Sequence, residues 1–301
     1  MAAVIVTYHR REGLAATVAA LRAQTHPPCA IVIVDNGGDV LLTDFADPSG
    51  LVLVSPGGNT GAAGGFALGM QTAFNDGHRW VYLINDDDRP RPRAIERLLA
   101  LATQGTSPTM AMGWVNLSGR VIATGALLRR GLEYPDIAEV GDQPYTADVS
   151  TFGGLLVPTA VIRDIGVPRA DFFMMWEEYE FCLRAGRAGW RIMVLPEPLV
   201  DIDGMPPGAR YRPWRTYYEA RNSLITLREY GSTSSLLWWA KRQLKYMLAS
   251  LRAPDRWQRL AMRSRGIIDG SDPAREAMRA CTSAAASPTT AGSWSIHIRA
   301  A

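Results

Sequence analysis

The sequence predicts an α/β fold in which a mostly parallel sheet is covered by helices on both faces. Two observations support this prediction. Short, fully apolar runs rich in β-branched residues recur through the first third of the chain, and such runs are typical of strands buried on both sides. Several of these runs are followed by segments whose apolar residues recur at helical spacing. Strands that alternate with helices in this way are typical of parallel sheets.

The elements follow one another in a regular order. The first strand is expected over 3–8 (AVIVTY), and a helix follows over 11–24 with Leu14, Val18 and Leu21 on one face. A second apolar run over 29–38 ends in the turn sequence DNGG. The next elements are a strand, a glycine-rich loop and a helix over 51–77, a fourth strand over 79–88, and a helix over 94–104.

The chain divides into three parts by composition. We expect a main α/β domain over 1–206, a basic helical appendage over 207–270, and a disordered tail over 271–301. The hydrophobic content of 47% with 20% charged residues is that of a globular protein, and no apolar run is long enough to span a membrane. The three cysteines form no CxxC pair, so a reducing cytoplasm is the expected location.

The net charge of +3 conceals an uneven distribution. Residues 207–265 hold 13 Lys and Arg against three acids, so this segment carries +10 and the remainder −7. Such a balance favours a polyanionic partner for the appendage. Within it, 234–252 is a basic amphipathic stretch with an apolar stripe (Leu237, Ala240, Leu244, Met247 and Leu251).

The residues beside this stripe favour a bilayer surface over a nucleic acid. Trp238 and Trp239 stand next to basic residues, a combination typical of helices that lie on membranes. The simpler alternative is that the stripe packs against the main domain. We therefore expect no nucleic-acid partner. Two interpretations of the stripe remain: peripheral contact with the inner face of the cell membrane, or packing on the main domain.

Three consecutive carboxylates, Asp86, Asp87 and Asp88, follow the fourth predicted strand. In a parallel sheet the carboxyl ends of the strands share one crevice, so Thr7 and Asp35 should meet them there. A single Asp at this place would be read as a turn residue. Because alternate residues point the same way, Asp86 and Asp88 can share one ion. Carboxylate oxygens suit Mg²⁺ or Mn²⁺, whose remaining ligands are often phosphate oxygens.

The glycine-rich loop GGNTGAAGGFALGM precedes a predicted helix on the same crevice. It is neither a Walker A loop nor a GxGxxG motif in register, and a tight strand-to-helix turn is its simplest reading. A helix N-terminus does favour an anion such as a diphosphate. Together with the carboxylates, the loop indicates a nucleotide-diphosphate ligand.

A second acidic cluster lies in an apolar setting, FFMMWEEYEFCLR, over 172–184. Acids at a helix N-terminus complement the helix dipole, which explains part of the pattern. A carboxyl beside Trp and Met is also partly desolvated, which raises its pKa and suits a general base. Glu180 precedes Arg184 by four residues and is expected to pair with it. This leaves Glu178 as the candidate base, with Glu177 the close alternative.

Five segments in this order resemble the family 2 glycosyltransferases: VIVTYHR, VDNGG, NTGAAGGFALGM, NDDD and WEEYEFCLRAGRAGW. The resemblance covers 3–230 and lies nearest the bacterial galactofuranosyl- and rhamnosyltransferase branch. It implies the Rossmann-like GT-A fold and an inverting transferase of polysaccharide or cell-wall synthesis. The donor implied is a nucleotide-diphosphate-sugar linked to UDP or dTDP. The acceptor implied is a glycan, a lipid-linked sugar or a small molecule.

The resemblance also implies roles for residues. Thr7 and Asp35 would hold the base and ribose of the donor nucleotide, and Asn59 with Gly64 and Gly65 would line its diphosphate.

Asp86 and Asp88 match the metal-binding acids of the family, with Asp87 beside the nucleotide. Glu178 matches the catalytic base, and Trp176 with Glu177 would contact the acceptor.

The implied mechanism is a single displacement in which Glu178 deprotonates the acceptor hydroxyl and the ion stabilises the leaving diphosphate.

The sequence departs from the family at one position. A histidine that commonly supplies a further metal ligand is replaced by Ile202, so Asp201 or Asp203 would have to serve instead. Two other functions remain open at this point. A nucleotidyltransferase on a similar scaffold would need a better triphosphate loop than VTYHRREG, and a non-catalytic protein could bind a polyanion or a membrane through 207–265.

Overall fold

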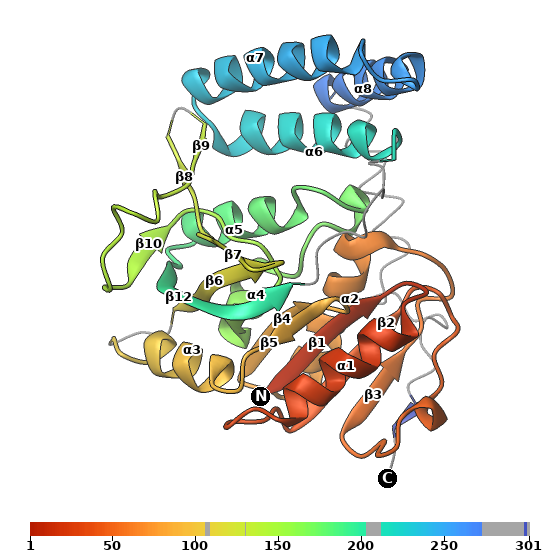
Figure 1. The fold of residues 1–301 in the computed structure, drawn as a ribbon, viewed down its shortest axis with the longest axis vertical. Coiled ribbons are helices and arrows are strands. Elements are labelled where there is room, and N and C mark those ends of the chain that lie inside the picture. Colours follow the sequence, from red (N-terminus) through yellow and green to blue (C-terminus); the bar gives the residue numbers. More distant parts are fainter. Residues whose placement is uncertain (106–108, 130, 203–211, 273–297, 300–301) are drawn as a thin grey trace.

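The computed structural model describes residues 1–105, 109–129, 131–202, 212–272 and 298–299. Its central sheet has the strand order β10-β12-β6-β11-β4-β1-β2-β3-β13. Strands β3, β2, β1 and β4 are parallel, and the sheet becomes mixed beyond β4, where β11 runs antiparallel to it. The predicted α/β fold is confirmed, and the molecule has a helical layer at the far end from strand β3 (Figure 1).

The first half of the chain follows the predicted alternation closely. Its elements are β1 (Ala2–Thr7), α1 (Arg11–Arg22), β2 (Ala30–Asp35), η1 (Leu42–Asp44), β3 (Leu51–Val54), α2 (Gly61–Asn75), β4 (Trp80–Asn85), β5 (Asp88–Pro90) and α3 (Ala94–Ala102). The predicted strand over 79–88 is the exception. It ends at Asn85, turns through Asp86 and Asp87, and resumes as β5, which pairs with β12 instead of continuing β4.

The second half adds the mixed strands, two further helices on the sheet and the appendage. Its elements are β6 (Met110–Leu117), β7 (Arg120–Ile122), β8 (Leu127–Leu128), β9 (Leu132–Glu133), β10 (Tyr145–Ala147), β11 (Leu155–Pro158), α4 (Thr159–Ile165), η2 (Ala170–Phe172), α5 (Glu177–Arg187), β12 (Ile192–Ile202), α6 (Arg215–Tyr230), α7 (Thr233–Ser250), α8 (Arg256–Ser271) and β13 (Ile298–Arg299).

Both faces of the sheet are covered because successive strand residues point to opposite sides. On one side, Ile5 and Ile33 pack with α1 and α3. On the other side, Val4 and Val32 pack with α2, α4 and α5. Fully apolar strands are therefore required, as the sequence pattern indicated.

A third apolar cluster joins the appendage to the main domain. It contains Phe172 and Trp176 from the segment before α5, Leu224 and Ile225 from α6, and Trp239 from α7. Helix α6 thus lies between α5 and the pair α7 and α8 (Figure 1). Most of the expected tail, 273–297 and 300–301, lies outside the described residues, but Ile298–Arg299 pairs antiparallel with the outer edge of β3.

Candidate active site

A cavity of about 370 Å³ opens at the carboxyl ends of β1 and β4. Strand β1 lies between β2 and β4, and its last residue, Thr7, is in register with Asp35. The lining comes from six separate stretches of the sequence: Val6, Thr7, Tyr8, Arg10, Asn36, Asn59, Gly61, Ala62, Asn85, Asp86, Asp87, Phe173, Met174, Trp214 and Arg215.

The acidic turn after β4 forms one wall of this cavity. Asp86 is buried and accepts a hydrogen bond of 2.7 Å from the Thr7 hydroxyl, so these two predicted residues do meet. Burial raises the pKa of Asp86. Asp87 is more exposed and is paired with Arg10, whose guanidinium also lies 3.5 Å from Asp86. Arg10 thus supplies the positive charge beside these two carboxylates.

Asp88 differs from the expectation that it points the same way as Asp86. Its carboxylate accepts hydrogen bonds from the backbone and side-chain amides of Asn85, at 3.0 and 2.8 Å, and it does not line the cavity. Burial raises its pKa to about 6. The physical reason is the turn after Asn85, because residues on either side of a turn do not alternate as they would along one strand.

The oxygen donors fit a divalent cation in part. Asp86 and Asp87 offer hard oxygen ligands to the cavity. Within the described residues, however, no three His, Cys, Asp or Glu side chains are arranged to hold a metal. Asp201 forms an ion pair of 2.9 Å with Arg91, so it is engaged elsewhere, and Asp203 lies outside the described residues. The metal role of Asp86 and Asp88 stays a prediction.

The loop after β2 contributes a residue that the sequence analysis missed. The carboxylate of Asp35 accepts from the backbone amides of Gly37 and Val40, at 2.9 and 2.8 Å, so it shapes its own loop. The neighbouring Asn36 lines the cavity instead. Its amide donates to the Gly61 carbonyl and its oxygen accepts from Thr60, which fixes the start of α2. The DNGG turn was visible in the sequence, but which of its residues lines the cavity was not.

The glycines of the loop divide into two groups. Gly61 lines the cavity with φ +70°, and a Cβ there would meet the Phe173 carbonyl. Asn59 also lines the cavity. Gly64 and Gly65 do not, which differs from the expectation. They are buried in α2, where a Cβ would meet Thr60 and Val6, respectively, at 2.6 Å. Gly65 allows α2 to pack closely on β1, whereas Gly64 leaves room for Thr60 at the start of the same helix.

The segment before α5 crosses over the start of α2. The Phe173 carbonyl accepts from the Ala63 amide at 3.0 Å. Phe173, Met175 and Trp176 all have positive φ, which is unfavourable for residues other than glycine. Asn222 of α6 holds this segment in place, because its buried amide donates to three of its carbonyls.

The acidic start of α5 follows directly. Glu177 is buried and one of its carboxylate oxygens has no hydrogen-bond partner, while Glu178 is less buried. Burial raises the pKa of both, and the charge of Glu178 raises that of Glu177 further. Glu180 forms the predicted ion pair with Arg184 at 2.8 Å. This interaction is confirmed.

The structure separates these acids from the cavity lining. Neither Glu177 nor Glu178 lines it, and Trp176 is packed into the apolar cluster with α6 and α7. In place of Trp176, an aromatic wall is formed by Phe173 and by Trp214, which is 38% exposed. Their ring centroids lie 6.4 Å apart.

Arg215, at the start of α6, also lines the cavity. Its Nε is buried and has no hydrogen-bond partner among the described residues. From the sequence, Arg215 was expected only as one of the basic residues of the appendage.

A Rossmann-like sheet with an acidic turn after β4 and paired acids at the start of α5 defines a GT-A-type transferase domain. The family described as "Glycosyltransferase like family 2" matches residues 1–243. The chain belongs to this family, which confirms the resemblance found in the sequence.

Named relatives agree with this assignment. The galactofuranosyltransferase GlfT1 of Mycobacterium tuberculosis (strain H37Rv) is 32% identical over 197 residues, which cover 62% of this chain and 64% of the relative. The chain thus spans just under two thirds of the length of that relative. The dTDP-rhamnosyl transferase RfbF of Shigella flexneri is 24% identical over 239 residues, covering 75% of this chain and 79% of the relative.

Solved structures support the fold. S. aureus TarS 1-349 in complex with UDP-GlcNAc gives a TM-score of 0.60 at 14% identity, covering 95% of this chain and 87% of that one. GalNAc-T7 with UDP, GalNAc and Mn²⁺ gives 0.61 at 12% identity, covering 88% and 54%. At these identities the likeness establishes the GT-A fold alone.

Proposed function

We propose that this chain transfers a sugar from a nucleotide-diphosphate-sugar to an acceptor hydroxyl, with inversion at the anomeric carbon. The observation that carries the proposal is the cavity at the ends of β1 and β4. This cavity combines the acidic turn, the start of α2 and an aromatic wall. Phe173 of that wall belongs to the segment that crosses over the start of α2, and the paired acids of α5 follow this segment in the chain. The names of the relatives favour UDP-galactofuranose or dTDP-rhamnose as donor.

The donor would lie with its nucleotide against β1 and its diphosphate toward α2. Thr7 is engaged with Asp86, so its place in the lining supports a role in shaping the nucleotide site. Asn59 and the α2 N-terminus face the diphosphate. Because the acidic turn repels a diphosphate, cations are needed, and among the described residues of the lining Arg10 and Arg215 carry guanidinium groups. In the family, a histidine at the position of Ile202 commonly supplies a further metal ligand and so helps to neutralise the diphosphate. Arg215 would take over part of this role here.

A divalent cation, Mg²⁺ or Mn²⁺, held by Asp86 with Asp88 as the second predicted ligand, would supply further charge stabilisation for the leaving diphosphate. Asp88 would have to release Asn85 to take part.

Glu178 is proposed to accept the proton of the acceptor hydroxyl. Its raised pKa makes it a stronger base than an exposed Glu. Burial and the charge of Glu178 raise the pKa of Glu177 further, so Glu178 is the acid of the pair that loses its proton more readily. The acceptor has to reach both Glu178 and the anomeric carbon of the donor, so segment 173–176 would lie beside the bound sugar. Because Trp176 is buried and Trp214 lines the cavity, we propose that Trp214 contacts the acceptor.

The test is a donor screen followed by product analysis. UDP- and dTDP-sugars are compared by thermal shift with Mn²⁺ and with EDTA, and the anomeric configuration of the product is read by NMR. A retained configuration would contradict the single displacement, and full turnover in EDTA would contradict the metal role. Selective stabilisation by nucleoside triphosphates would instead indicate the nucleotidyltransferase alternative.

A further inference from the structure

Helix α7 presents its leucines outward. Leu237, Leu244 and Leu248 are 56%, 59% and 57% exposed, and Leu251 just beyond the helix is 49% exposed. At about 100° per residue, these four positions fall in one stripe roughly 60° wide. The expected apolar stripe therefore exists, but it does not pack against the main domain.

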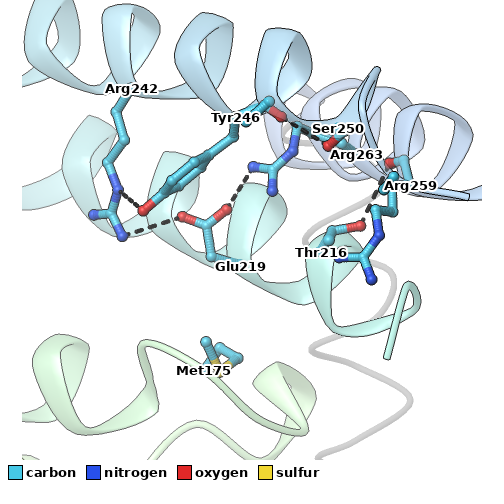
Figure 2. A pocket seen from close by; sticks show the side chains of 10 residues that line it. Met175, Thr216, Glu219, Arg242, Tyr246, Ser250, Arg259 and Arg263 are labelled. Carbon is cyan, nitrogen blue, oxygen red and sulfur yellow. Dashed lines mark hydrogen bonds and ion pairs between the residues drawn. The ribbon is translucent and has the colours of Figure 1, made fainter. Parts of the chain in front are cut away.

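The opposite side of α7 is buried and combines the apolar contact of Trp239 with polar interactions, which explains this orientation. Trp239 is buried and donates to the Ser223 hydroxyl at 2.7 Å. Glu219 of α6 pairs with Arg263 of α8 at 2.7 Å and with Arg242 of α7 at 3.7 Å (Figure 2). An amphipathic helix on a solvated domain normally does the reverse, with its apolar side in the core. The internal ion pairs fix α7 with its apolar stripe exposed.

Positive charge borders the stripe. Lys241, Lys245 and Arg252 are exposed and fall about 40° to 80° to one side of Leu237 on the same helical projection. The two lysines are the only lysines in the chain, and α7 contains no acidic residue. Trp257, in the first turn of α8, is 70% exposed. Trp257 is thus more exposed than Trp238, which packs against Gly131, and than Trp239, which is buried.

We propose that this α7 face, defined by Leu237, Leu244, Leu248 and Leu251 with Lys241, Lys245 and Arg252, docks on an anionic phospholipid bilayer. In a helix that lies at a membrane interface, leucines enter the boundary of the acyl chains, and the aliphatic parts of lysines extend so that their charges reach the lipid headgroups. Charge decides between a bilayer and a second copy of this chain, because two such faces would bring like charges together. Within the described residues no helix is long and apolar enough to span the bilayer.

The docking proposal is independent of catalysis, but it bears on the proposed function. An enzyme held at a bilayer would meet an acceptor carried on a lipid. This step rests on the proposed glycosyl transfer, whereas vesicle binding can be measured on a protein with no known substrate.

The experiment is co-sedimentation of the full chain with phosphatidylcholine vesicles that contain 25% phosphatidylglycerol, as well as with pure phosphatidylcholine. We expect binding to the anionic vesicles that weakens strongly between low and high salt. Each basic residue near the surface contributes about fivefold to partitioning, so K241Q/K245Q/R252Q should bind about 100-fold more weakly. L244Q/L248Q should also lose binding. All five positions are exposed, so the fold should persist.

Matched controls separate this face from general charge and hydrophobicity. R93Q/R120Q/R163Q removes the same charge from exposed positions of the main domain, and L41Q/L117Q removes two exposed leucines there. Both controls should bind like the wild type. Acetylation of Lys241 and Lys245 by an N-hydroxysuccinimide ester, read by mass spectrometry, should slow when anionic vesicles are present.

Two results would overturn the proposal. One is a protein that stays in the supernatant with anionic vesicles at low salt. The other is a dimer in sedimentation velocity that L244Q/L248Q dissociates while vesicle binding is absent, since the face would then join two copies of the chain.

Discussion

Replacing Asn222 by Ala tests whether α6 positions the acids of α5. Asn222 is fully buried, and its amide donates to the carbonyls of Phe172, Met174 and Met175 at 2.9, 2.9 and 2.8 Å. Each net hydrogen bond stabilises by about 0.5–1.5 kcal/mol, and buried carbonyls left unpaired cost more. We expect the free energy of unfolding to fall by about 2–4 kcal/mol, measured by urea denaturation.

The effect on turnover should be larger than this loss implies. The segment held by Asn222 includes three residues with positive φ, whose strain is of order 1–3 kcal/mol each and is maintained only by surrounding contacts. Without the amide, the segment can relax and displace Glu177 and Glu178. A displacement of about 1 Å can cost a factor of 10² in rate.

The measurement is kcat at donor and acceptor concentrations that saturate the wild-type enzyme. The temperature is chosen so that circular dichroism shows N222A to be folded. Asn75 provides the matched control. It is exposed near the end of α2 and its side-chain oxygen accepts a hydrogen bond from Gln71, so N75A should be within twofold of wild type in kcat. An N222A enzyme that is destabilised but keeps wild-type kcat would refute the positioning argument.

Three further predictions concern the site itself. E178Q should keep donor affinity by thermal shift but lose turnover by about 10²–10⁴, whereas E177Q should retain most activity; a dead E177Q beside an active E178Q would reverse the assignment within the pair. Because burial raises the pKa of Glu178, and the base must be ionised, kcat/KM should fall as pH drops through a value above the ordinary Glu pKa of about 4.3; a limb at or below that value would count against Glu178 as base. R215Q should weaken donor binding by about tenfold or more, because a hydrogen bond to a charged group contributes about 1.5–3 kcal/mol. R212Q, at an exposed position, is the control, and equal donor affinity in both variants would show that Arg215 does not bind the diphosphate.

The parts of the fold that depend on local pattern could be predicted from sequence. The strands β1, β2 and β4 are buried on both faces, so their apolar runs were sufficient evidence. The meeting of Thr7 with Asp86 also followed, because parallel strands bring their carboxyl ends to one edge. These predictions needed no information about partners distant in the sequence.

Other features depend on distant partners and could not be read locally. Asp88 leaves the cavity because β5 pairs with β12, more than 100 residues later. Trp239 is buried because Ser223 of another helix accepts its indole N–H. In the sequence the stripe of α7 could either face a membrane or pack on the main domain, and the partners of Trp239 and Glu219 show that the opposite side faces inward.

Helix α6 also changes how the boundary at 206 should be understood. Its first turn places Arg215 in the cavity, and Asn222 holds the segment before Glu177. From the same helix, Glu219 pairs with α7 and α8 and so determines which side of α7 is exposed. Because α6 lines the candidate site and also contacts α7 and α8, we propose that it belongs with the main domain. The functional unit therefore includes α6, and the basic layer beyond it, α7 and α8, is held at a fixed orientation to the active site.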